Sequence, residues 1–350
     1  MNQSQRKTRC SSLTALARTL AIPFLAIVIA ITCFVLFALA QGVGLNGLYS
    51  ALYYGVLTNS NFLTQTFVKA VPLICAMLAV IVPARAGLVN VGGEGQLVVG
   101  AVAGTGTAVA FSNSGLGVFG IIATILVSAL AGGVWGYLCA AMKTGLHAPE
   151  AVTTLLTNFI ATDIMLFLLY SSWKDPKGSG QPQSRPVPRF LRMGNVFGIP
   201  VAFIIVICLC VAIWCLLDKS SWGFSARVVG SNPEAAFRSG LSVNRYAQSA
   251  MFIGGALAGI GGALNILGAE GQLRPGITTT FGFIAFLAAF IAKGNVLAGT
   301  IYATVAAAVL VAGNPLQLRA GLDGNATYVL LGVTCLAIVV ISQRITRRTS

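Results

Sequence analysis

Long apolar runs without charged residues alternate with short polar segments along the whole chain. A transmembrane helix needs about 20 mostly apolar residues, and fewer where neighbouring helices cover it. By that measure the pattern predicts ten membrane-spanning helices. They cover residues 20–40, 67–82, 96–110, 118–142, 151–170, 198–217, 247–268, 277–292, 295–312 and 326–342. We therefore predict an all-α, polytopic membrane protein in which residues 1–350 form a single transmembrane domain.

The N-terminal segment carries four basic residues before the first apolar run, as a signal peptide does. The run at 20–40 is too long for a signal-peptide core and lacks a clear cleavage site, so we predict a first transmembrane helix after a cytoplasmic segment at 1–19. Ten spans then return the C-terminus to the cytoplasm. Of the 22 lysines and arginines, 14 would lie inside and eight outside, in the direction of the positive-inside rule.

The composition supports a membrane protein and excludes several other classes. Hydrophobic residues make up 56% of the 350 and charged residues 9%, whereas soluble domains carry about 25% charged residues. The net charge of +14 resides in short loops between apolar runs, so it does not indicate a nucleic-acid binder. The eight cysteines lie mostly in apolar runs without a C-x-x-C pair, which favours packing roles over a metal site. No acid–base cluster indicates an enzyme, and we expect no cofactor.

A polar, glycine-rich break, PARAGLVNVGGEGQ at 83–96, separates the second and third spans. Non-helical backbone at membrane depth is tolerated only inside protein or beside a water-filled cavity. We therefore take Asn90, Glu94 and Gln96 as candidate substrate-pathway residues. The alternative is a structural break in which the Glu94 carboxylate caps the N-terminus of a neighbouring helix.

Two further stripes are candidates for the same pathway. Thr154 and Asn158 share one face of the fifth span at i, i+4, and they would either line the pathway or hydrogen-bond between helices. Phe283 and Phe286 share a face of the eighth span, which would either stack on a ring of the substrate or pack in the core. Asp163 lies in the fifth span, where a lone aspartate costs roughly 2.5–3.5 kcal/mol, so it must face protein or water.

The polar segment at 171–197 is rich in proline, glycine and serine, which predicts an irregular outer loop. It violates the positive-inside trend with five basic residues on the outer side. We interpret these residues as a docking surface for an acidic partner. They are Lys174, Lys177, Arg185, Arg189 and Arg192.

The polar segment at 218–246 contains a helix start signal on the predicted cytoplasmic side. A capping residue, a proline and an acid open the helix and Gly240 ends it, so we predict a short helix at 232–239. Two turns are unstable alone and need a partner surface. We expect two alanines to keep this helix slim enough to enter a groove, a phenylalanine to anchor it and an arginine to sit at the rim. Its residues are Asn232, Pro233, Glu234, Ala235, Ala236, Phe237 and Arg238. The alternative is a capped surface turn packed on its own chain.

The tetrapeptide Glu-Gly-Gln-Leu occurs at 94–97 and again at 270–273. Each copy follows the first helix of a possible four-helix unit, and the two units would run in opposite directions. This indicates two inverted repeats, a common transporter plan. The chain has no G-x-x-x-x-G-K-[ST] motif and no soluble segment of sufficient length, so ATP-driven transport would require a separate ATPase chain.

Four strings together, PARAGLVNVGGEGQ, PEAVTTLLTNFIA, QPQS and GSNPEAAFRSGLSVNRY, resemble permease subunits of bacterial ABC importers. That superfamily handles simple sugars, nucleosides and branched-chain amino acids. The resemblance runs from about residue 67 to the C-terminus and is closest to the nucleoside-type branch, because the G-x-I-D-L-S-V-G string of the ribose-type branch is absent. One departure is Val-Gly-Gly-Glu, where related permeases usually have Ile-Gly-Ala-Glu.

The resemblance implies a ten-helix permease of the bacterial cytoplasmic (inner) membrane, paired with a second homologous permease around a central pathway. A separate ABC ATPase would bind the helix at 232–239 as its coupling helix. A substrate-binding lipoprotein would deliver nucleosides to the basic outer loop. The alternatives are a simple-sugar permease and an ion-coupled secondary transporter, which would need a buried charge relay through residues such as Glu94 and Asp163. No nucleic-acid partner is expected.

Overall fold

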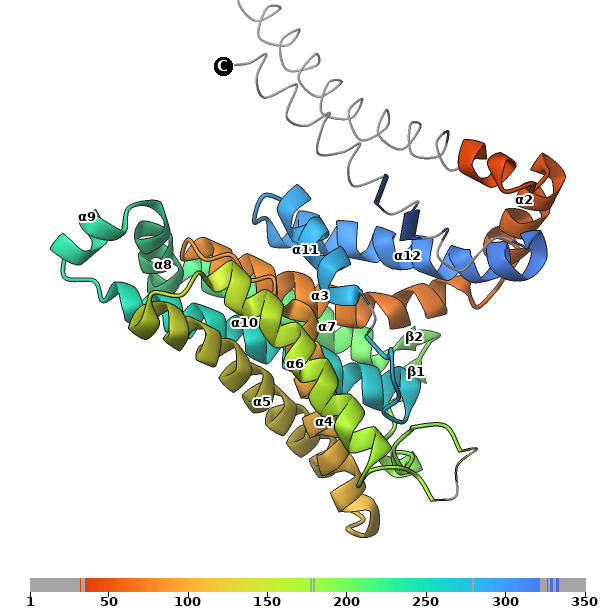
Figure 1. Ribbon diagram of the computed structural model, residues 1–350, viewed down its shortest axis with the longest axis horizontal. Helices are drawn as coiled ribbons and strands as arrows, with labels where there is room; N and C mark the ends of the chain where they lie inside the picture. Colours follow the sequence, from red (N-terminus) through yellow and green to blue (C-terminus); the bar gives the residue numbers. More distant parts are fainter. Residues whose placement is uncertain are drawn as a thin grey trace, which may run out of the picture. The chain divides into compact units, whose positions relative to one another are not determined.

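A computed structural model describes residues 32, 35–176, 178, 180–278, 280–321, 326, 328–329 and 332–333. The chain divides into two compact units, one formed by residues 1–62 with 309–350 and the other by residues 63–308. The described regular structure is helical apart from a ribbon of two short antiparallel strands (Figure 1). This follows from the apolar sequence, because a helix satisfies its backbone hydrogen bonds internally where no water is available.

The first unit contains α2 (Leu45–Leu52), the π-helical turn η1 (Tyr53–Leu57) and the last part of α12 (Val296–Ala320). A glycine is required where the two segments touch, because a Cβ on Gly55 would lie 2.2 Å from the Pro315 Cβ. Residues 41–66 are thus partly helical, through α2, η1 and the start of α3 (Phe62–Arg85). The predicted spans at 20–40 and 326–342 lie largely outside the described residues.

The second unit contains the long helices and the two polar segments. In chain order its elements are α3 (Phe62–Arg85), α4 (Gly93–Ala110), η2 (Phe111–Asn113), α5 (Gly117–Leu146), α6 (Glu150–Tyr170), η3 (Arg189–Leu191), β1 (Asn195–Val196), β2 (Ile199–Pro200), α7 (Val201–Lys219), α8 (Ser221–Ser231), α9 (Pro233–Arg238), α10 (Val243–Asn265), the π-helical turn η4 (Ile266–Glu270), α11 (Phe281–Ile291) and the first part of α12.

Among the described residues, seven helices are long and apolar enough to cross a membrane: α3, α4, α5, α6, α7, α10 and α12. They coincide with seven of the ten predicted spans. The eighth prediction, at 277–292, is wrong in length, because α11 has only 11 residues. An isolated crossing needs about 17–25 residues. The ten-span count and the inverted repeats remain predictions.

The core of the second unit lies around α3 and α10. In each of these helices 78% of the most apolar window is buried within the protein, against 28% in α5, α6 and α7. Helix α10 packs beside α4 and α5 (Figure 1). A Cβ on Gly259 would lie 2.1 Å from the Ser128 carbonyl oxygen, and a Cβ on Gly100 would lie 2.4 Å from the Gly259 Cα. Glycines thus permit the close helix approach typical of membrane bundles.

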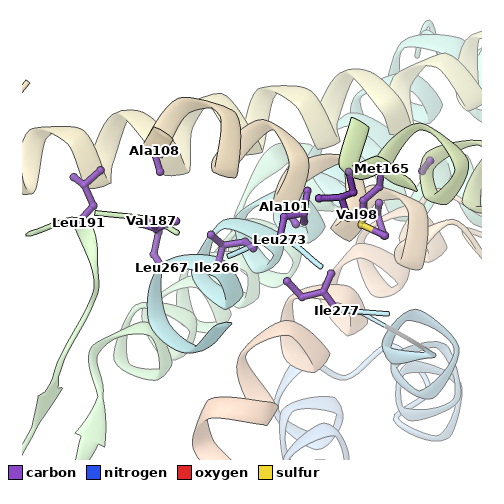
Figure 2. Packing of buried hydrophobic residues seen from close by; sticks show 12 residues of the cluster. Val98, Ala101, Ala108, Met165, Val187, Leu191, Ile266, Leu267, Leu273 and Ile277 are labelled. Carbon is purple, nitrogen blue, oxygen red and sulfur yellow. The ribbon is translucent and has the colours of Figure 1, made fainter. Parts of the chain in front are cut away.

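The 171–197 loop is irregular as predicted, but it is fastened to the segment that follows α10. The Ser184 amide donates to the Leu273 carbonyl at 2.9 Å, and the Val187 amide donates to Gly271 at 2.7 Å. Figure 2 shows Val187 and Leu191 in the same apolar cluster as Leu267. The loop is therefore held in place by both hydrogen bonds and buried side chains.

Candidate functional site

A buried pair of side-chain amides holds the break between α3 and α4. The Asn90 Nδ2 donates to the Gln96 Oε1 at 3.0 Å, and the Gln96 Nε2 donates back to the Asn90 Oδ1 at 3.2 Å. Asn90 also donates to the carbonyl of Ala79 on α3 at 2.8 Å and accepts from the Gly92 amide at 2.9 Å. Both side chains are fully buried, so these bonds supply the partners that the broken backbone lacks.

Two polar residues of α6 complete this support from a neighbouring helix. The Asn158 Oδ1 accepts from the Gly95 amide at 2.8 Å, and its Nδ2 donates to the Val91 carbonyl at 3.0 Å. The Thr154 hydroxyl accepts from the Val91 amide at 3.2 Å. The i, i+4 spacing thus places both side chains against the break, where they hydrogen-bond between α6 and the start of α4.

The Glu94 carboxylate lies where the N-termini of two helices meet. Glu94 belongs to the first turn of α4, and its Oε2 accepts from the Gly282 amide in the first turn of α11 at 2.6 Å. Thr278 and Thr280 also hydrogen-bond to Glu94, through a side chain and a backbone amide respectively. A Cβ on Gly282 would lie 2.3 Å from the Glu94 amide nitrogen, so only glycine permits this approach. One carboxylate therefore offsets the positive ends of two helix dipoles.

The structure joins five of the seven predicted pathway residues, Asn90, Glu94, Gln96, Thr154 and Asn158, in or beside this network. The two phenylalanines lie on α11 itself and not among the amides. Phe283 is 41% exposed and Phe286 is half-buried. The link between this network and the two phenylalanines is the Glu94 carboxylate, which accepts from the backbone of α11.

Sequence reasoning missed an ion cluster at the second Glu-Gly-Gln-Leu copy. The nearly buried Glu270 carboxylate accepts from Lys69 of α3 at 3.4 Å and also pairs with Arg274. The Lys69 ammonium lies 5.6 Å from the centroid of the Phe281 ring. The i, i+4 spacing of Glu270 and Arg274 was a detectable signal, whereas the contact with Lys69 bridges 201 positions.

The two copies of the tetrapeptide differ in local structure. Residues 94–97 open α4, whereas Glu270 ends η4 and Gly271 turns the chain with a φ of 67°. The sequence match is therefore not a match of conformation.

The short helix predicted at 232–239 is present as α9. The Asn232 Oδ1 caps it by accepting from the Ala235 amide at 3.0 Å, Pro233 occupies its first turn and Gly240 follows it with a φ of 82°. Phe237 is 72% exposed. Ala236 is fully buried against its own chain, whereas Ala235 is exposed. Helix α8, which precedes α9, was not predicted.

Helix α8 contacts the end of α3 directly. A Cβ on Gly230 would lie 2.4 Å from the carbonyl oxygen of Arg85. The Asp218 carboxylate pairs with Arg227 of α8 at 2.9 Å and with Arg85 at 3.2 Å. Arg85 also donates to the Gly294 carbonyl at 3.2 Å. Helix α8 therefore packs against the residue at which α3 ends and the break begins.

The basic residues of the 171–197 loop occupy different environments. Lys174, Arg185 and Arg189 are exposed, and Lys177 lies outside the described residues. Arg192 is exposed as well, and its guanidinium donates to the carbonyls of Val187 in the loop and of Gly271 after η4 at 3.3 Å each. Arg185 lines a cavity of about 340 Å³ together with Trp173, Ser172 and the outer turns of α4.

Comparison with known proteins finds one family and several relatives. The model of the family described as "Branched-chain amino acid transport system / permease component" matches residues 61–339. The chain is 28% identical to a glucose ABC transporter permease of Haloferax volcanii, over 83% of this chain and 79% of that protein. It is 29% identical to a guanosine ABC transporter permease of Bacillus subtilis, over 81% and 82%. It is also 29% identical to a nucleoside ABC transporter permease of Lactococcus lactis, over 65% and 74%. No solved structure gives a significant match.

Proposed function

The chain belongs to the branched-chain amino acid transport system permease family, and from that premise we propose that it translocates nucleosides as a membrane subunit of an ATP-driven importer. Its relatives are ABC permeases of the sugar and nucleoside type, which are transport subunits and not enzymes. The observation that carries the proposal is the match to guanosine and nucleoside permeases over most of the chain, combined with a capped helix that projects an unpartnered phenylalanine.

The movement that drives transport is transmitted to the permease through α9. A separate ATPase chain on the cytoplasmic side receives Phe237 in a groove, and α9 follows the movement of that groove. Helix α8 passes the displacement to the end of α3 through the Gly230 contact and the Asp218 ion pairs. A helix of six residues needs such a partner surface to act as a lever, since two turns are unstable alone.

The displacement then reaches the broken helices. The break between α3 and α4 carries Asn90, and the start of α4 carries Glu94 and Gln96. Thr154 and Asn158 link this region to α6, and Glu94 links it to α11 with its two phenylalanines. These residues border the pathway and determine how far the helices that enclose it can shift. A second homologous permease supplies the opposite wall.

Substrate arrives through a lipoprotein receptor that binds the exposed basic residues Lys174, Arg185 and Arg189, together with Lys177. The hydrogen bonds between the loop and residues 271–273 keep this surface in place before the receptor arrives. Both chain termini lie in the cytoplasm in this arrangement, and the permease resides in the cytoplasmic membrane of a bacterium.

Uptake in cells tests the proposal. Deletion of this gene should abolish uptake of labelled guanosine, and expression of the permease with its ATPase and receptor should restore it. A variant of the ATPase that cannot hydrolyse ATP should leave uptake at the level of the deletion. Uptake that continues without any ATPase and follows the proton or sodium gradient would instead establish a secondary transporter.

A simple sugar is the second candidate substrate, favoured by the match to the glucose permease of Haloferax volcanii. The same cells distinguish the two candidates when labelled glucose and guanosine are offered separately. Loss of glucose uptake with unchanged guanosine uptake in the deletion strain would assign the sugar.

A further inference from the structure

A cavity of about 410 Å³ opens between α8 and the start of α10. Its walls are an aromatic residue of α8, the link between α9 and α10, and the first turns of α10. They comprise Trp222, Gly240, Leu241, Ser242, Arg245, Tyr246 and Ser249. The Trp222 Nε1 donates to the Ser249 Oγ at 3.2 Å, and the ring centroids of Trp222 and Tyr246 lie 6.5 Å apart. The two helices that form the cavity are thus bonded to each other, and aromatic rings form one of its walls.

Arg245 gives this cavity a positive charge that no carboxylate of the described residues compensates. The carboxylates at this end of the second unit pair with other bases: Asp218 with Arg85 and Arg227, Glu150 with Lys143, and Glu234 with Arg238. Within the described structure the other lining residues are neutral, and the exposed Ser242 hydroxyl caps no backbone amide. Guanidinium and hydroxyl groups donate to phosphate oxygens, and arginine does so with two parallel hydrogen bonds. The cavity therefore suits a phosphate group.

The ends of α7 and α10 place the cavity at the level of the lipid headgroups. Both helices are long and apolar enough to cross a membrane; α7 ends at Lys219 and α10 begins at Val243. The Lys219 ammonium lies 5.5 Å from the centroid of the Trp214 ring, and Trp214 is 44% exposed. A lysine beside an exposed tryptophan at the end of a span is typical of the membrane interface, where tryptophan and tyrosine concentrate. Trp222 follows Lys219 by three positions and Tyr246 lies in the first turn of α10, so both belong to this layer.

From this arrangement we propose that the cavity binds the phosphate of an anionic phospholipid of the cytoplasmic leaflet, with Arg245 and Ser242 as its donors. The inference goes beyond the proposed function and takes from it only the cytoplasmic orientation of this end of the chain. Anionic headgroups of that leaflet attract basic residues at the membrane surface. The rings of Trp222 and Tyr246 contact the glycerol and the first methylenes of the acyl chains, as amphipathic rings do at headgroup level. A soluble phosphate would use the donors but not this aromatic wall, which is why the lipid is favoured.

Thermal unfolding of the purified full-length permease in detergent tests the binding. Phosphatidylglycerol added to the micelles should raise the melting temperature more than phosphatidylcholine, whose headgroup is neutral overall, because a ligand of the folded state stabilises it. Arg245→Gln should weaken the binding of phosphatidylglycerol by roughly tenfold or more, the value of hydrogen bonds to a charged group. The matched control is Lys293→Gln, which removes an exposed cation beside the Arg85 contact with Gly294 and outside the cavity. An equal loss in both variants, or no loss in Arg245→Gln, would overturn the proposal.

A second variant keeps the arginine and changes the charge of the cavity. Ser242 is exposed, so Ser242→Glu should retain the fold and the melting temperature measured without lipid. The new carboxylate stands three residues before Arg245, where it pairs with the guanidinium and repels a phosphate. Stabilisation by phosphatidylglycerol should therefore be lost. If Ser242→Glu is stabilised by this lipid as strongly as the wild type, the lipid binds elsewhere and the proposal fails, even where Arg245→Gln does not fold.

Two further measurements identify the source of the anion. Inorganic phosphate should not reproduce the effect of phosphatidylglycerol; if it stabilises the wild type equally, and not Arg245→Gln, the cavity takes a soluble phosphate and the lipid is excluded. In vesicles of phosphatidylethanolamine with photoactivatable phosphatidylglycerol, the permease in complex with its ATPase should be labelled within residues 240–249. Labelling confined to other parts of the permease would show that a protein surface covers the cavity, and would overturn the proposal. None of these measurements depends on which substrate the permease transports.

Discussion

The Glu94 side chain supplies hydrogen-bond acceptors to backbone N–H groups that helix geometry leaves unsatisfied. Two helix N-termini meet at this residue, and each presents backbone N–H groups that no turn of its own helix satisfies. The carboxylate belongs to one of these helices and accepts from the Gly282 amide of the other. Its negative charge is favourable at both ends, because both dipoles point their positive poles toward it. Glu94 therefore joins α4 to α11.

Replacement of Glu94 should weaken the contact between α4 and α11. Glu94→Gln keeps the size of the side chain and one acceptor oxygen, but it removes the charge and replaces the other oxygen by an NH2 donor that faces backbone N–H groups. We expect a loss of about 1–3 kcal/mol in the free energy of unfolding, the range for a buried group that loses a charged partner. Thermal unfolding of the purified permease in detergent measures it. Glu234→Gln on the exposed surface of α9 is the control and should leave the melting temperature unchanged; equal shifts for both variants would contradict the role.

A second prediction for a single residue concerns Gly259, where the packing distance between two helices matters and not charge. A Cβ at this position would overlap the Ser128 carbonyl of α5. Gly259→Ala should therefore push α10 away and cost roughly 1–3 kcal/mol, as overpacking of a tight contact does. Gly145→Ala is the matched control, because nothing lies within 4 Å of the Cβ it would add in α5. That variant should be neutral or gain about 0.5–1 kcal/mol from helix propensity. A stable Gly259→Ala protein would show that the helices separate at little cost.

At the scale of elements, the sequence was informative wherever a helix carries its own start and stop signals. Asn232, Pro233 and Gly240 predicted α9 because capping and φ preferences act locally. Helix α8 was missed although Ser220 caps it, because its first turn has no acidic residue and its sequence has no long apolar run. The length of α11 was overestimated because the apolar run at 277–292 continues through residues that do not extend the helix, including Thr280 with a φ of 66°.

The exposed phenylalanine of α9 allows a prediction about how this helix binds the ATPase. Phe237→Ala should leave the fold intact, because this side chain is largely outside the protein. It should weaken the ATPase complex by about 2 kcal/mol, as the loss of a central aromatic anchor does. Co-purification of the ATPase and substrate-stimulated ATP hydrolysis in proteoliposomes measure the effect.

Two variants on the same helix serve as controls. Arg238→Gln removes an exposed ion pair with Glu234, which contributes only about 0–1 kcal/mol, so coupling should persist. Ala236→Leu should instead destabilise the permease itself, because Ala236 is buried. A Phe237→Ala complex with normal association and normal coupled hydrolysis would place the ATPase contact elsewhere.

At the scale of the whole molecule, the sequence predicted the class of fold and the position of its breaks, but not which side chains meet across the chain. The carboxylate of Glu94 and the amide of Gly282 stand 188 positions apart. No local pattern reports that contact, and both interpretations of Glu94 were consistent with the same residues. Asp163 is exposed on α6, and this outward direction was likewise undetermined, because periodicity gives the face of a helix but not what covers it.

The basic loop makes a prediction for the assembled transporter. Replacement of Lys174, Arg185 and Arg189 by glutamine together, with Lys177, should slow receptor-dependent uptake and reduce its dependence on salt. Each exposed pair contributes only about 0–1 kcal/mol, so single replacements should have small effects. Uptake rates at low and high ionic strength measure this, because salt screens exposed charges beyond about 8 Å at physiological strength.

Arg192 is a useful comparison within the same loop. Its guanidinium is bonded to two backbone carbonyls, so Arg192→Gln should lower thermal stability and leave the salt dependence of uptake unchanged. Normal uptake at every ionic strength in the fourfold variant would show that the loop's charge has no part in receptor binding.

The length of α11 has a consequence for how the protein is made. A helix of 11 residues is about 16 Å long, whereas the hydrocarbon layer is about 30 Å thick. The translocon therefore cannot release α11 into lipid as an independent segment. Its partner Glu94 is synthesised 188 positions before Gly282. Helix α4 is therefore made before the amide that its carboxylate accepts from. Biogenesis should accordingly include a step in which the helices inserted before α11 receive this short helix, and failure of that step would leave the Glu94 carboxylate without its Gly282 partner.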